Sequence, residues 1–125
     1  MNSSEQFAKQ KYLNLETFRK NGESMKTPVW FTQEDEILYV RTLANSGKVK
    51  RIRNNGRVNI APCKMDGKIV GTWMPAQARE VNSPEVDATV ERLLDKKYGL
   101  IKKLFERQST RSGAKDTILE IKISE

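Results

Sequence analysis

The sequence predicts a mainly β protein with a few helices, folded as one domain over residues 1–125. Three observations predict this class: short β-prone segments alternate with turn signals, one strongly amphipathic helix follows Ser83, and 125 residues suit a single domain with a modest core. Hydrophobic residues make up 37% and charged residues 31% of the chain, which is typical of globular proteins. Such a chain is short for enclosing a large ligand alone, so help from a second subunit is expected.

The clearest hairpin signal lies in YLNLETFRKNGESMKTPVWF, residues 12–31. Its Asn21-Gly22 pair tolerates the positive φ that tight hairpin turns require. The elements expected in this part of the chain are a short helix over 3–10 that Ser3 or Ser4 caps, two strands within 12–31, a polar turn over 32–36 and a strand over 37–42.

A basic stretch follows, RTLANSGKVKRIRNNGR, over residues 41–57. It contains six Lys or Arg residues and no acid, whereas the whole chain has 23 Lys and Arg against 16 Asp and Glu, a net charge of +7. Nearly all of the excess charge is therefore local. The stretch predicts a short helix with a cap at Asn45 or Ser46, an apolar side formed by Val49 and Ile52, and an end at Gly56. Lys48 and Arg51 share another helix face, while Lys50, Arg53 and Arg57 are expected to be solvated.

The second half of the chain predicts more strands and the strongest helix. Residues 82–99 have Ser83 as a cap, Pro84 in the first turn and Gly99 as an end, with an apolar stripe of Val86, Val90, Leu93 and Leu94. The other expected elements are a strand over 57–63, a turn at Asp66-Gly67, a strand over 68–74 that Pro75 interrupts and 76–81 resumes, a shorter helix over 100–108, and a strand over 116–124 in which Leu119, Ile121 and Ile123 alternate.

Several kinds of chemistry are excluded by composition. The chain has no histidine, which excludes Ser-His-Asp and Cys-His catalysis and histidine metal ligands, and its one cysteine, Cys63, forms neither an internal disulfide nor a zinc cluster. No metal site, Walker loop or dinucleotide glycine motif is predicted. Since no segment resembles a signal peptide or membrane span, the expected location is the cytoplasm. Any demanding chemistry would come from a cofactor.

Two kinds of anion suit the basic stretch. Nucleic acid is one, because basic helices contact phosphates and small β-barrels bind single strands. A phosphorylated cofactor is the other, because the amides near Ser46-Gly47, with Lys48 and Arg51 close by, form a compact anion pocket. A merely solvated basic helix is the third reading, and spacing alone leaves all three open.

The order and spacing of YLNLETFRKNG, MKTPVWF, LYVRT, SGKVKRIRNNGRVNIAPC and GTWMPAQA resemble the pyridoxamine-phosphate-oxidase-like FMN-binding split barrels. Within that superfamily the chain is most similar to the small branch of coenzyme F-420 (deazaflavin)-dependent oxidoreductases. The resemblance runs from about Lys11 to Val81 and continues more weakly to the last strand. It implies a six-stranded split β-barrel in a homodimer, with two cofactor sites at the subunit interface.

The resemblance also implies which residues bind the cofactor. Lys26 and Thr27 would lie near the polar edge of the flavin-like ring, and Trp73 would lie near the site across the interface. The residues expected to receive the phosphate and its neighbouring chain are Arg41, Thr42, Ser46, Gly47, Lys48 and Arg51. The alternative for Lys26 is an ordinary exposed strand lysine, and for Trp73 it is packing in the core or interface.

The function that this resemblance implies is a homodimeric oxidoreductase that binds reduced coenzyme F-420 and passes hydride to an unsaturated or quinone-like acceptor. No catalytic residue is assigned, since the cofactor would carry the hydride chemistry. The rivals are an FMN-dependent oxidoreductase of the same fold, a flavin carrier or sensor without turnover, and a small nucleic-acid-binding barrel. Oxidation of pyridoxamine phosphate is not favoured because the chain ends soon after its last strand, and haem degradation is not favoured because there is no histidine ligand.

Overall fold

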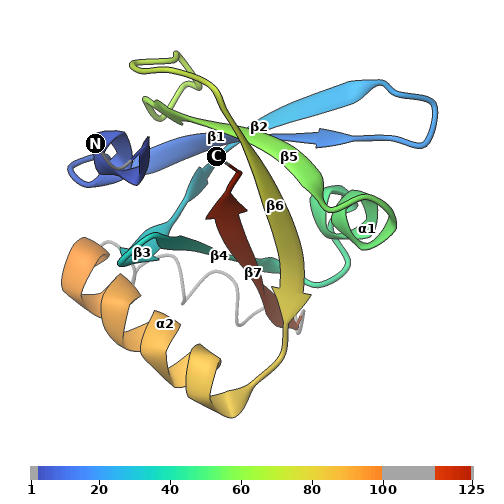
Figure 1. Cartoon of the computed structure of the whole chain (residues 1–125). Coiled ribbons are helices and arrows are strands. Elements are labelled where there is room, and N and C mark those ends of the chain that lie inside the picture. Colours follow the sequence, from blue (N-terminus) through green and yellow to red (C-terminus); the bar gives the residue numbers. More distant parts are fainter. Residues whose placement is uncertain (1–2, 100–114, 125) are drawn as a thin grey trace.

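The computed structural model describes residues 3–99 and 115–124. These residues form a curled antiparallel sheet with helices against it (Figure 1), in the strand order β2-β1-β5-β6-β7-β4-β3. The strands are β1 (Tyr12–Phe18), β2 (Ser24–Trp30), β3 (Thr32–Glu34), β4 (Ile37–Leu43), β5 (Arg57–Cys63), β6 (Met74–Val81) and β7 (Asp116–Ile123). The helices are η1 (Ser3–Phe7), α1 (Gly47–Asn54) and α2 (Pro84–Tyr98). The mainly β split-barrel fold is confirmed, with seven strands among the described residues instead of six.

The core lies inside the curl of the sheet. Alternate residues of the long strands point inward and are almost fully buried, among them Leu13, Leu15, Leu38, Val40, Ile60, Leu119 and Ile121. Helix α1 packs against β1 and β6 and adds Val49 and Ile52 to this core, as its apolar spacing predicts. The other side of α1 is therefore left for its charged residues.

Helix α2 covers a second, smaller cluster on the outer side of the sheet. Val90, Leu94 and Tyr98 of α2 pack on Tyr39 of β4 and Ile118 of β7. The predicted helix is confirmed at both ends, because Ser83 Oγ accepts a bond of 3.5 Å from Val86 N and Gly99 follows the last residue. Tyr98 takes the place of Leu93 in the buried stripe, and the helix expected over 100–108 lies outside the described residues.

Both predicted glycine turns are present, each as a three-residue loop. Gly22 has φ 91° and donates to Arg19 O at 2.9 Å, and Gly67 has φ 92° and donates to Lys64 O at 2.8 Å. The left-handed region is accessible to glycine without strain, so each hairpin can close beside its glycine. The Asn21-Gly22 and Asp66-Gly67 predictions are confirmed.

Three boundaries differ from the sequence prediction. Thr32–Glu34 pair with β4 as strand β3, so the predicted turn over 32–36 narrows to Asp35 and Glu36. The strand expected over 68–74 is wrong: an isolated bridge joins Cys63 to Ile69, and the next strand starts only at Met74. The short helix expected over 3–10 ends at Phe7 as a 3₁₀ helix.

Pro75 does not interrupt a strand, contrary to expectation. It is the second residue of β6, paired with Asn59 of β5, and its carbonyl accepts a bond of 2.9 Å from Ser124 N at the end of the β6–β7 ladder. A proline at a strand start removes at most one ladder bond there, so β6 continues through it to Val81.

Candidate anion-binding site

The start of α1 leaves one hydroxyl without a partner. Ser46 occupies the N-cap position, as predicted, but its side chain caps no amide. Its Oγ is buried and has no hydrogen-bond partner. The first helical bond runs from Lys50 N to Ser46 O at 3.2 Å, so the amides of the preceding first-turn residues have no acceptor within the helix. This helix start therefore presents several backbone donors that the helix itself does not satisfy.

Lys48 lies beside this helix start and is half-buried. Its Nζ donates to Thr42 Oγ1 on β4 at 3.3 Å. Burial lowers the pKa of the Lys48 ammonium, and the nearby Arg51 lowers that pKa further. The structure thus brings together Thr42, Ser46 and Lys48, three of the residues expected to hold a phosphate.

Arg51 reaches across the same helix start. Its Nε donates to Thr17 Oγ1 on β1 at 2.7 Å, and a Cβ added to Gly47 would lie 2.8 Å from its Nη1. The guanidinium therefore occupies the space over Gly47 that any side chain would fill. Burial lowers the pKa of Arg51, and the charge of Arg19 adds to that effect.

No carboxylate neutralises this pair of cations among the described residues. Arg53, on the same helix, forms two bonds of 2.8 and 2.9 Å to the carboxylate of Glu80. Lys48 and Arg51 instead bond to threonine hydroxyls, which carry no charge. Two partly buried cations beside unused donors are the arrangement that binds an anion. We call Thr17, Thr42, Ser46, Gly47, Lys48 and Arg51 the α1 anion cluster.

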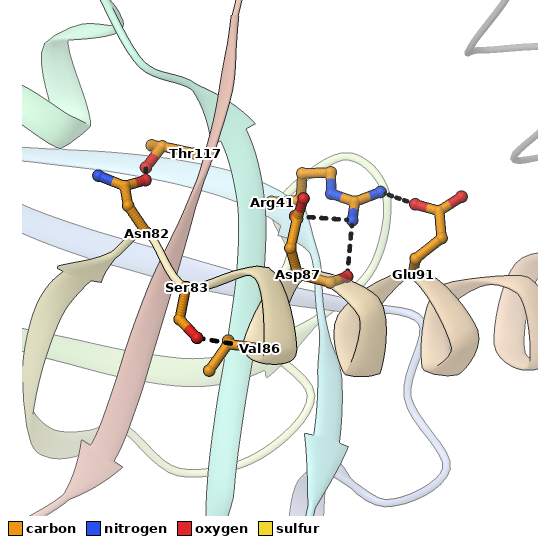
Figure 2. A network of polar contacts seen from close by, with 7 residues as sticks. All are labelled: Arg41, Asn82, Ser83, Val86, Asp87, Glu91 and Thr117. Atoms are coloured by element: carbon orange, nitrogen blue, oxygen red, sulfur yellow. Dashed lines mark hydrogen bonds and ion pairs between the residues drawn. The ribbon is translucent and has the colours of Figure 1, made fainter.

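Arg41 lies apart from the α1 anion cluster. Successive strand residues point to opposite faces, so Arg41 faces α2 while Thr42 faces Lys48. Figure 2 shows the Arg41 guanidinium between Asp87 and Glu91 of α2, with ion pairs to both carboxylates and a bond of 3.4 Å to the Asp87 carbonyl. The side chain of Arg41 is thus held by α2 of its own chain.

Lys26 lies on the opposite face of the β1–β2 pair from Thr17, whereas Thr27 lies on the same face as Thr17. Lys26 is exposed on the outer face of β2, opposite Glu16, and its Nζ lies 5.5 Å from the centre of the Trp73 ring. Thr27 lies on the inner face, opposite the core residue Leu15. The structure therefore joins Lys26 to Trp73 within one chain and leaves both away from Lys48 and Arg51.

Thr17 is the member of the cluster that the sequence prediction missed. It is 1% exposed and is the next inward-facing position after Leu13 and Leu15. The alternation of β1 could have placed it at the end of the core, but nothing local to β1 indicates that an arginine 34 residues away would reach it.

Two hollows among the described residues lie elsewhere. One of about 300 Å³ is lined at the start of α2 by Asn82, Ser83 and Asp87 and by the first residues of β7. The other, of about 260 Å³, is lined by residues of β6 and β7 around Arg79 and Glu120. Acidic side chains line the first hollow, and in the second Glu120 pairs with both Arg79 and Lys122, so neither hollow contains cations that lack a carboxylate partner.

Comparison with known families identifies the chain. The model of the pyridoxamine 5'-phosphate oxidase family matches residues 2–125. The chain belongs to this family. A comparison with curated proteins gives no significant match. The sequence resemblance to the superfamily is therefore confirmed.

Solved structures share the fold of this pyridoxamine 5'-phosphate oxidase family member. HutZ, the heme storage protein of Vibrio cholerae, is 17% identical with a TM-score of 0.72, covering 98% of this chain and 87% of its own. An F420 reductase is 16% identical with a TM-score of 0.64, covering 100% and 95%. An FAD-binding protein from Mesorhizobium loti is 13% identical with a TM-score of 0.64, covering 98% and 85%. At these identities the likeness shows the fold alone.

Residues 3–99 and 115–124 contain no group of three or more Cys, Asp or Glu side chains that could hold a metal ion. None of the described helices is both long and apolar enough to cross a membrane.

Proposed function

We propose that the protein is a homodimeric oxidoreductase that binds a flavin-type cofactor, coenzyme F-420 by preference, and transfers hydride to a small-molecule acceptor. One observation carries the proposal: Lys48 and Arg51 lack a carboxylate partner and lie beside the unpartnered Oγ of Ser46 at the start of α1. The family, whose fold is shared by an F420 reductase and an FAD-binding protein, supports a flavin-type ligand.

The residues of the α1 anion cluster fit the phosphate of such a cofactor. The Ser46 hydroxyl has no hydrogen-bond partner, the first-turn amides have no acceptor within the helix, and the absence of a Cβ at Gly47 leaves room for the Arg51 guanidinium. Thr42 holds Lys48 from the neighbouring strand. A phosphate also relieves the mutual repulsion of the two cations, which lowers the pKa of Lys48.

The ring of the cofactor is assigned to β2. Lys26 would stabilise negative charge at the polar edge of the ring, and the Trp73 ring, 5.5 Å from Lys26 Nζ, is close enough for a cation–π contact with the ammonium. Thr27 follows on the opposite face of the strand. The cofactor, when bound, supplies the hydride chemistry, so the protein contributes binding, orientation and electrostatics.

Dimerisation is part of the proposal because one chain brings the two halves of the site to different faces. Lys26 is on the outer face of the β1–β2 hairpin, while Lys48 and Arg51 lie with inward-facing Thr42 and Thr17. A cofactor that spans two subunits can contact the cluster of one chain and the β2 strand of the other. Arg41 is left out of the phosphate set because α2 already holds it.

Side-by-side titration with FMN and coenzyme F-420, followed by absorbance and fluorescence, tests the proposal. We expect tight binding of coenzyme F-420, weaker binding of FMN, and reoxidation of the reduced cofactor by an unsaturated or quinone-like acceptor. Tighter binding of FMN than of coenzyme F-420 would indicate that FMN is the cofactor. Binding without oxidation by any acceptor would indicate a carrier or sensor. Binding of neither, together with salt-sensitive binding of single-stranded nucleic acid, would overturn the proposal.

A further inference from the structure

We infer that Thr17 is a positioning residue for the phosphate site: it fixes the Arg51 guanidinium over the start of α1, in space that Gly47 leaves open. The inference deepens the proposed function and rests on the α1 anion cluster being the phosphate site. The juxtaposition that carries it joins three elements, since Thr17 comes from β1, Gly47 from the first position of α1 and Arg51 from the next turn.

Arg51 keeps most of its N–H donors after it bonds to Thr17. A guanidinium has five N–H groups in a fixed plane. Thr17 Oγ1 takes the one on Nε, at 2.7 Å, and this bond fixes the plane of the group. The four N–H groups on Nη1 and Nη2 stay available, and two parallel N–H groups are what a phosphate oxygen pair accepts.

The remaining donors of Arg51 lie close to Gly47. Nη1 and Nη2 are 2.8 and 3.6 Å from the position that a Cβ of Gly47 would occupy. The guanidinium therefore lies beside the first residue of α1, where the first-turn amides have no acceptor within the helix and the neighbouring Ser46 Oγ is buried without a partner. Thr17 thus holds the arginine next to the start of α1.

The bond between Arg51 and Thr17 reduces the entropy cost of binding an anion. A free arginine loses rotamer freedom when it binds an anion, and this entropy cost reduces the affinity. Thr17 is 1% exposed and lies on β1, which pairs with a strand on each side. It therefore restricts the rotamers of Arg51 before a ligand binds. A similar bond from Thr42 fixes Lys48, but at 3.3 Å it is longer.

Two substitutions distinguish a positioning role of Thr17 from a purely structural one. Thr17→Val keeps the shape of the side chain and removes only the hydroxyl, so folding should survive. Gly47→Ala introduces a Cβ where the guanidinium lies while favouring the helix itself. Both changes should therefore weaken anion binding without unfolding the protein.

The test measures the dissociation constant of inorganic phosphate, and of whichever of FMN and coenzyme F-420 binds the wild-type protein, by calorimetry. We expect Thr17→Val and Gly47→Ala each to weaken the binding of both ligands about fivefold, the scale of one ordinary hydrogen bond. In an Arg51→Ala background, Thr17→Val should have no further effect, because Thr17 acts through Arg51. Thr32→Val, a buried threonine on β3, is the matched control and should leave both constants unchanged.

The outcomes separate the two claims. Wild-type affinity for the cofactor and phosphate in Thr17→Val would overturn the inference and leave the proposed function standing. An equal loss for Thr17→Val in the wild-type and Arg51→Ala backgrounds would also overturn it, since Thr17 would then act independently of Arg51. Weaker phosphate binding with no flavin bound by any variant would support the inference and overturn the proposed function. Absence of all binding in the wild type would overturn both.

Discussion

At the scale of single residues, Lys97 stands out among the described cations because its ammonium lies against an aromatic ring and a backbone carbonyl. Its Nζ donates to Phe31 O at 2.9 Å and lies 3.4 Å from the centre of the Phe31 ring. The next residue, Tyr98, accepts from Phe31 N at 3.0 Å and stacks on Trp30 with ring centres 4.2 Å apart. The end of α2 is thus joined to the β2–β3 connection through one lysine and one tyrosine.

Lys97 should make stability depend on pH. Burial lowers its pKa from 10.5 to about 8, so between these values the unfolded chain holds a proton that the folded chain has released. The free energy of unfolding should therefore rise from pH 8 to pH 10, by on the order of 1 kcal/mol because the side chain is only partly buried. Urea unfolding at pH 8 and at pH 10 measures this rise in the free energy of unfolding.

Lys97→Met should remove this rise, while Lys96→Met, at the exposed neighbouring position, should keep it. The change in unfolding free energy between pH 8 and pH 10 is compared between each variant and the wild type. The difference removes the contribution of groups that titrate in both proteins, including Tyr98, whose pKa is raised by burial. The same pH slope in Lys97→Met as in the wild type would show that another group is responsible.

The residues of the candidate site were predictable where the signal was local. Lys48, Ser46, Gly47 and Arg51 are all within one helix start, so spacing alone indicates that they meet. The contacts that complete the cluster cross the sheet, and sequence spacing carries no information about them. Arg41 illustrates this, because its partners Asp87 and Glu91 are on a helix 46 and 50 residues away.

At the scale of elements, β2 is an edge strand whose open side is poorly suited to another strand. Arg19 N bonds to Glu23 O at 2.8 Å, and by alternation the amide positions of Lys26 and Pro28 face away from β1. Pro28 has no N–H and Lys26 is charged, and both features discourage strand pairing at an edge. The open side of β2 is thus suited to a small ligand more than to an added strand.

The junction of α1 with β5 should be sensitive to a single methyl group. A Cβ at Gly56 would lie 2.6 Å from the carbonyl oxygen of Ala78, whose amide bonds to Gly56 O at 2.8 Å. Because the clash is with backbone, Gly56→Ala should lower the free energy of unfolding by about 1–3 kcal/mol. Urea unfolding measures the loss.

Gly22→Ala is the comparison for that experiment. A Cβ added at Gly22 would have no heavy atom within 4 Å, so only the positive φ of 91° disfavours alanine there. The substitution should cost about 1 kcal/mol, from strain alone. A Gly56→Ala protein as stable as the wild type would mean that β5 and β6 can separate locally, contrary to the described register.

The elements were predictable where pattern and turn chemistry agreed. The β1–β2 hairpin, α1, β5 and α2 have periodicity bounded by glycine or a cap, β4 follows a polar turn, and all of these elements are present. Residues 68–74 are apolar enough for a strand, but only one bridge forms, and the backbone N–H and C=O of Thr72 instead bond to the side chain of Gln6, at 2.9 Å each. Such a long-range contact depends on tertiary packing, which a local pattern does not report.

At the scale of the whole molecule, the proposed site requires a second copy of the chain. We therefore expect a dimer that persists at low micromolar concentration without cofactor, because the subunit contact must exist before the ligand can bridge it. Light scattering at several protein concentrations measures this. A monomer that still binds the cofactor tightly would contradict the shared site.

The charge distribution leads to the most direct test of the account. Six of the 23 Lys and Arg are in residues 41–57, yet Lys48 is half-buried within the α1 anion cluster, while Lys50 is exposed on the same helix. If a phosphate binds there, Lys48→Ala should weaken a phosphorylated cofactor by about thirtyfold, or about 2 kcal/mol, and Lys50→Ala should change it little.

The deciding measurement is the dissociation constant of FMN and of riboflavin, and of coenzyme F-420 and a phosphate-free deazaflavin, for wild type and Lys48→Ala. The account predicts a large loss for the phosphorylated member of each pair and a small one for its phosphate-free partner, with folding intact. Equal losses within a pair would contradict the assignment of the phosphate to Lys48, and equal losses for Lys48→Ala and Lys50→Ala would indicate a diffuse basic surface.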